Sequence, residues 1–173
     1  MKRDIILSGV GGQGILSIAT VIGRAALAEG LQLKQAEVHG MSPRGEADLI
    51  VSLEPMEALR YLPWLAPDGW VITGTVPVVN IPDYPDAEAL QRELDSLPHA
   101  VTLDTDALAR AAASPRSANM VLLGAAAPML GIGTERLEAG IRDIFARKGE
   151  QMVEMNLAAF RAGCEATRKQ TKR

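Results

Sequence analysis

The sequence predicts an α/β domain in which a mostly parallel sheet has helices on both faces and is followed by a helical C-terminal part. Three observations predict this class. Short apolar runs alternate with longer helical patterns through residues 5–103. The apolar runs are continuous, as in strands that are buried on both faces. Beyond residue 105 the helical patterns follow one another without strands between them.

The first elements form a βαβ unit. A buried strand is expected at residues 5–7, where the apolar run stops before a glycine. A helical pattern then covers residues 13–29 and ends at Gly30, a usual helix terminator. The run at residues 31–33 is expected to be the next strand, which closes a unit of about 30 residues.

The remaining elements follow from the same patterns and from turn residues. Pro55 suits a first helical turn, and the proline-containing stretch 74–85 suits extended surface chain. We expect a loop at 37–46, strands at 48–52, 70–73 and 100–103, a turn at 68–69, and helices at 56–65, 87–94, 105–113, 117–130, 134–147 and 150–168.

Composition excludes several classes of function. Residues 1–173 suit one domain, and 47% of them are hydrophobic. The net charge of -3 gives no basic field for nucleic acid, and the positive tail from Arg168 to Arg173 is expected to be solvated. No apolar stretch approaches a membrane span or a signal peptide, so the expected compartment is the cytoplasm. The single cysteine, Cys164, cannot supply the thiolates of an iron–sulfur cluster and is interpreted as a structural thiol.

A glycine-rich loop is the sharpest local signal. Gly9, Gly11, Gly12, Gln13 and Gly14 follow a predicted strand and open a predicted helix, as in Rossmann-like dinucleotide sites. Glycines there permit a tight turn, close backbone approach to a phosphate and close packing, and free N–H groups favour an anion. The same glycines are also compatible with packing alone.

A second loop is expected at the same rim of the sheet. His39, Gly40 and Ser42 follow the second predicted strand, and ligands of open α/β sheets bind at the carboxyl ends of strands. Glu37 is a possible acidic partner for a ribose, although it begins a polar loop, so conventional NAD binding is the weaker interpretation. With two histidines and no clustered carboxylates, we expect no metal site.

Three further candidates keep alternative interpretations. Glu54 could be a functional carboxylate at the rim or could stabilise the start of the next helix. Asn119 is expected to bond to local backbone. Gln13 could donate to a phosphate or a partner carbonyl, or could simply be exposed. No residues form an evident nucleophile–base set, so no catalytic residue is assigned.

Three motifs in order resemble the gamma-domain family of 2-oxoacid:ferredoxin oxidoreductases, and most closely the beta subunits of indolepyruvate:ferredoxin oxidoreductases. They are Gly-Val-Gly-Gly-Gln-Gly at residues 9–14, Glu-Val-His-Gly-Met-Ser at 37–42 and Gly-Glu-Ala-Asp at 45–48, which leads to 53–63. The resemblance continues through residues 119–125 and 156–163, so it covers nearly the whole chain.

The resemblance implies a division of labour between subunits. A larger subunit would hold thiamine diphosphate, magnesium and iron–sulfur clusters, decarboxylate an aryl-2-oxoacid and reduce ferredoxin. Coenzyme A would accept the acyl group, and a chain of this type would help form the coenzyme A side of the site without binding a cofactor alone. The eight candidate binding residues are Gly9, Gly11, Gly12, Gln13, Gly14, His39, Gly40 and Ser42.

One departure from the family affects the loop at residues 37–47. Ser42 is followed at once by Pro43-Arg44-Gly45-Glu46, where the family has a longer, hairpin-like segment. The loop is therefore either shortened or incompletely represented, and we favour the second interpretation.

Two other classes of function remain open. A free-standing NAD- or flavin-binding oxidoreductase predicts dinucleotide binding by the isolated chain. A non-catalytic regulatory or scaffold module predicts partner binding without an effect on turnover. A nucleotide-activating enzyme is weaker, because the arginine and acidic metal ligands that it needs have no evident position.

Overall fold

The computed structural model describes residues 2–35, 43–112 and 114–171. Its centre is a parallel sheet with strand order β1-β2-β3-β4. The strands are β1 (Ile5–Ser8), β2 (Ala47–Ser52), β3 (Leu65–Gly74) and β4 (Ala100–Leu103). Because all four strands run in the same direction, their carboxyl ends meet at one edge of the sheet.

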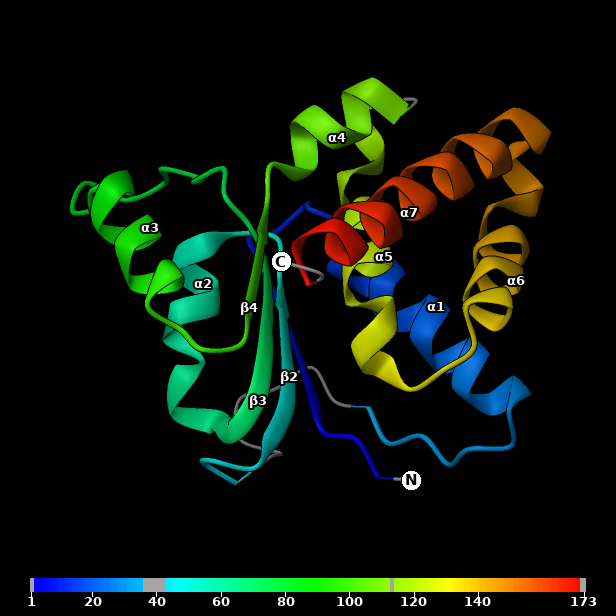
Figure 1. The fold of residues 1–173 in the computed structure, drawn as a ribbon. Helices are drawn as coiled ribbons and strands as arrows, with labels where there is room; N and C mark the ends of the chain where they lie inside the picture. The colour runs from blue at the N-terminus through cyan, green and yellow to red at the C-terminus, as the bar shows by residue number, and fades with distance from the viewer. Residues whose placement is uncertain (1, 36–42, 113, 172–173) are drawn as a thin grey trace.

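Helices cover both faces of the sheet, as predicted. Helices α2 (Pro55–Arg60) and α3 (Ala87–Asp95) lie on one face (Figure 1). The other face has α1 (Ile15–Ala28), α5 (Ala118–Leu130), α6 (Thr134–Phe145) and α7 (Glu150–Gln170), and α4 (Thr105–Ala112) packs beside α5 and α7. Within the described ranges, single-turn helices also occur at Leu62–Trp64, Pro115–Ser117 and Ala146–Lys148.

The predicted strand at residues 31–33 is wrong. Residues 31–35 form neither strand nor helix. Leu31 packs against the core, and the side chain of Leu33 lies 2.9 Å from the position that a Cβ on Gly23 of α1 would take. These leucines therefore cover α1 rather than pair with β1, and β2 is the strand that completes the βαβ unit.

Two smaller corrections concern the middle of the chain. The helix predicted at 56–65 ends at Arg60, and a short helical turn follows it. The turn predicted at 68–69 lies inside β3, next to a register shift opposite Ala47 and Leu49. The other predicted helices are present, with boundaries within a few residues.

Helix α5 is the central helix of its layer, because it is buried on almost every side. It crosses α7 at two glycines. A Cβ on Gly124 would lie 1.9 Å from the Phe160 carbonyl oxygen, and a Cβ on Gly163 would lie 1.9 Å from the Val121 carbonyl oxygen. The two backbones are therefore in direct contact.

The side chain of Cys164 is half-buried in this layer. Burial raises the pKa of its thiol to about 11, so the thiol stays protonated at neutral pH, as expected for a structural cysteine.

We predict that Gly163→Ala destabilises the chain strongly. Its methyl group has no room against the Val121 carbonyl, so the free energy of unfolding should fall by about 3 kcal/mol or more. Urea denaturation followed by circular dichroism measures the change. Gly11→Ala is the matched control, because nothing lies within 4 Å of a Cβ at Gly11. Equal stability of the two variants would contradict this account of the helix crossing.

Candidate functional site

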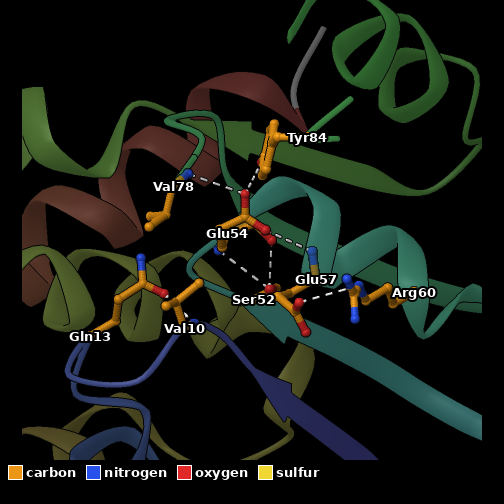
Figure 2. A network of polar contacts seen from close by, with 8 residues as sticks. All are labelled: Val10, Gln13, Ser52, Glu54, Glu57, Arg60, Val78 and Tyr84. Atoms are coloured by element: carbon orange, nitrogen blue, oxygen red, sulfur yellow. Dashed lines mark hydrogen bonds and ion pairs between the residues drawn. The ribbon is translucent and has the colours of Figure 1, made fainter. Parts of the chain in front are cut away.

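The glycine loop connects the carboxyl end of β1 to the start of α1. Gln13 closes it from both directions: its backbone N–H donates to the Val10 carbonyl at 3.2 Å, and its side-chain Oε1 accepts from the Val10 N–H at 2.7 Å. Figure 2 shows the oxygen of this side chain turned to Val10 and its nitrogen turned away. The loop is therefore braced by a side chain of its own.

A second brace comes from α5, far along the chain. Asn119 is 8% exposed, and its Nδ2 donates to the Gly14 carbonyl at 3.2 Å. Gly14 has a φ of 83°, and a Cβ there would lie 2.6 Å from Asn119 Nδ2. The expectation that Asn119 bonds to local backbone is wrong, because its partner is 105 residues away. Gly14 permits both the turn and this contact.

Gly11 differs from the other described glycines. Its φ is not positive, and a Cβ there would meet nothing within 4 Å. Among the described residues, no contact or backbone conformation requires glycine at this position. A small side chain at this position would therefore extend from the loop into open space.

A hollow of about 300 Å³ lies beside the loop, at the carboxyl edge of the sheet. Its apolar lining consists of Leu53, Val76, Val78, Pro115 and Ala118. Its other lining residues are Gly12, Gln13, Thr105, Asp106, Arg116 and Asn119. The hollow thus brings the glycine loop together with residues from the ends of β2 and β4 and from the start of α5.

The starts of α1 and α5 both border this hollow. Neither helix has a side-chain cap at its N-terminus or an acidic residue in its first turn. By contrast, α2 and α3 are capped by Glu54 and Asp86. The positive ends of the two helix dipoles therefore favour acceptor groups on the loop side of the hollow.

Glu54 lies at the end of β2 and is fully buried. Its Oε2 accepts from the Glu57 N–H at 2.8 Å and so caps α2. Its Oε1 accepts from the Val78 N–H at 3.3 Å and from the Tyr84 hydroxyl (Figure 2). Both oxygens are thus bonded within the chain, so the structure favours the helix-start interpretation over a carboxylate open to a ligand.

These bonds hold the segment of residues 75–86, which has no regular structure, against the sheet. Burial and the bond to Glu54 raise the pKa of Tyr84, so its hydroxyl remains a donor. Val76 and Val78 of this segment form a wall of the hollow. Glu54 thereby fixes the position of that wall.

The second loop predicted for the site, with Glu37, His39, Gly40 and Ser42, lies outside the described residues. Its role remains a prediction. Sequence reasoning assigned no site role to Thr105, Asp106, Arg116, Val76 and Val78, which the fold places in the hollow. Thr105 and Asp106 follow the end of a predicted strand, and that position was a usable signal.

No group of three or more metal-ligating side chains occurs among the residues in the described ranges. Within those ranges, no helix has both the length and the hydropathy to cross a membrane.

Comparison with known proteins supports one family. The family model for pyruvate ferredoxin/flavodoxin oxidoreductase matches residues 4–47 and 38–166. The chain is 32% identical to the indolepyruvate oxidoreductase subunit IorB of Thermococcus kodakarensis, over 96% of each chain. It is 30% identical to the 2-oxoglutarate synthase subunit KorC of Archaeoglobus fulgidus, over 98% of this chain and 90% of that subunit.

Solved structures share the fold. The gamma subunit of a keto/oxoacid ferredoxin oxidoreductase from Geobacter sulfurreducens has a TM-score of 0.73 at 23% identity, covering 97% of this chain and 99% of that one. The 2-oxoglutarate:ferredoxin oxidoreductase of Magnetococcus marinus, solved with 2-oxoglutarate, coenzyme A and succinyl-CoA, has a TM-score of 0.68 at 22% identity. This chain matches 32% of that longer chain.

The alignments also bear on the loop at residues 37–47. The alignment with the Thermococcus subunit extends over 198 positions, more than the 173 residues of this chain, so that relative has residues without a counterpart here. The two ranges matched by the family model overlap at residues 38–47. Whether the loop is shortened or incompletely represented stays a prediction.

We predict that Tyr84→Phe loosens residues 75–84 without unfolding the chain. It removes one donor from Glu54 but keeps the α2 cap, so the loss of stability should be roughly 1 kcal/mol. Hydrogen exchange followed by mass spectrometry should show faster exchange in this segment and unchanged exchange in α6. Unchanged exchange at residues 75–84 would show that Tyr84 does not hold the segment.

Proposed function

Because this chain belongs to the pyruvate ferredoxin/flavodoxin oxidoreductase family, we propose that it completes the coenzyme A side of a thiamine-dependent 2-oxoacid:ferredoxin oxidoreductase. Its relatives are subunits of an indolepyruvate oxidoreductase and of a 2-oxoglutarate synthase, and they support a subunit role. The observation that supports the finer proposal is the hollow, where the glycine loop and two uncapped helix starts meet.

Coenzyme A is the ligand proposed for this rim. The Magnetococcus relative was solved with coenzyme A and succinyl-CoA. In this chain the hollow has donors along the glycine loop and the exposed Arg116 among its lining residues. Those groups suit binding and orientation of a ligand, and we assign no proton transfer or nucleophile to them.

The redox cofactors belong to the partner in this proposal. A cluster needs several thiolates, and this chain has one cysteine, which is half-buried in the helix layer. Magnesium needs clustered oxygen ligands, and the described residues contain no such group. A larger subunit with thiamine diphosphate, magnesium and iron–sulfur clusters would therefore perform the decarboxylation and pass electrons to ferredoxin.

The proposed substrate is an aryl-2-oxoacid such as indolepyruvate. The support is that IorB subunits of four organisms match this chain at 30–32% identity, against one 2-oxoglutarate synthase subunit at 30%. Since the thiamine subunit surrounds the reacting carbons in this proposal, substrate choice is expected to follow that subunit rather than this chain.

Anaerobic co-purification with the large subunit tests the proposal. The complex should reduce a viologen dye with indolepyruvate only when coenzyme A is present, and the isolated chain should be inactive. Pyruvate and 2-oxoglutarate serve as alternative substrates. Binding of NAD or flavin by the isolated chain, with no complex formed, would favour the free-standing oxidoreductase instead.

We predict that Gly11→Leu lowers coenzyme A-dependent turnover by at least about tenfold while the melting temperature stays unchanged. The side chain meets nothing in the described structure but blocks the outer side of the loop. Gly11→Ala, with a single methyl group, should show a smaller loss. Full turnover of the leucine variant would exclude close approach to this loop by either the ligand or the partner.

A further inference from the structure

Two carboxamides flank the glycine loop, and each uses only one half of its amide to brace it. Gln13 accepts through Oε1 from the Val10 N–H, and Asn119 donates through Nδ2 to the Gly14 carbonyl. These partners fix the orientation of both amides, because only oxygen accepts from N–H and only nitrogen donates to a carbonyl. The remaining halves are Gln13 Nε2, a donor, and Asn119 Oδ1, an acceptor.

Both remaining atoms are open to the hollow. Neither has a hydrogen-bond partner among the described residues, and neither belongs to the buried atoms without partners, which are Ser8 Oγ and His99 Nδ1. Gln13 and Asn119 both line the hollow. The lining residues of the hollow therefore offer both a donor and an acceptor that no described residue uses.

The rest of the lining decides which ligand group fits this pair. A phosphate beside this pair would meet an acceptor, Asn119 Oδ1, and the acidic residue Asp106 is also among the lining residues. Its one positive side chain, Arg116, is exposed. A secondary amide has both a donor and an acceptor, and its flanking methylene groups suit the apolar walls at Leu53, Val76 and Val78.

We propose that the hollow binds a secondary amide within an apolar chain, and that this amide is in the pantetheine arm of coenzyme A, with the nucleotide outside. The proposal rests on the proposed function and makes it more specific. The volume agrees with it, because about 300 Å³ is at the lower limit of small-molecule sites and suits one segment of a long cofactor. In this arrangement Gln13 Nε2 donates to the amide carbonyl, and Asn119 Oδ1 accepts from the amide N–H.

Gln13→Glu is the sharpest variant for a test. The new carboxylate still accepts from the Val10 N–H, so the brace of the loop is kept, and only the outward donor becomes a negatively charged acceptor. Gln32→Glu is the matched control, because it adds the same charge at an exposed position outside the hollow. The melting temperature of each variant is measured first, to establish that the fold is kept.

The measurement is the turnover of the reconstituted complex at varied coenzyme A concentration. It is made with and without each of two inhibitors, pantetheine and adenosine 3′,5′-bisphosphate, which represent the two halves of the cofactor. In the Gln13→Glu complex, KM for coenzyme A and the inhibition constant of pantetheine should both rise by about tenfold or more. The inhibition constant of adenosine 3′,5′-bisphosphate and kcat at saturating coenzyme A should stay within about twofold of the wild type. The control variant should match the wild type throughout.

Three results would overturn the proposal. The first is an unchanged inhibition constant of pantetheine in the Gln13→Glu complex. The second is a rise in the inhibition constant of adenosine 3′,5′-bisphosphate instead. The third is loss of the large subunit by the variant, which would mean that the Gln13 side-chain amide bonds to the partner's backbone. A wild-type complex without coenzyme A-dependent turnover would instead refute the proposed function. Saturation-transfer NMR of pantetheine on the wild-type complex detects the contact with the hollow without turnover.

Discussion

The contact between α5 and α7 determines the position of the candidate site. At Gly124 and Gly163 the two helix backbones touch, which holds α5 closely against α7 as the buried central helix of its layer. Asn119, near the start of α5, therefore reaches Gly14 and holds the glycine loop. A loop formed by the first residues of the chain thus depends on a helix crossing formed by the last, and neither part specifies the loop conformation alone.

A second constraint acts from the opposite face of the sheet. Glu54 is buried without a cationic partner among the described residues, and its side-chain oxygens accept from two backbone N–H groups and the Tyr84 hydroxyl. This arrangement fixes Val78 and its neighbours as a wall. The hollow therefore has two independently held sides, since Asn119 fixes the loop side and Glu54 fixes the wall. Local change on one side need not disturb the other.

Much of the fold could be predicted from local pattern, because buried strands and amphipathic helices differ in the spacing of apolar residues. The failure at residues 31–33 has a physical reason. Leu31 and Leu33 alternate with polar residues as in a strand, but Leu31 packs against the core and the largely exposed Leu33 lies against Gly23 of α1, so neither belongs to the sheet. The glycine loop was predictable from its context. Arg116 and the partner of Asn119 were not, because they join the loop only through contacts distant in sequence.

A glycine loop before a helix does not by itself select a ligand. Its N–H groups favour any acceptor, and the same turn occurs in sites for unrelated molecules. In this chain the selection falls to the groups around the loop. Asn119 Oδ1 and Asp106 add acceptors where a dinucleotide site needs donors, and apolar side chains occupy the opposite wall. The glycine loop thus lets a ligand come close to the backbone, and the side-chain amides of Gln13 and Asn119 determine which ligand group fits there.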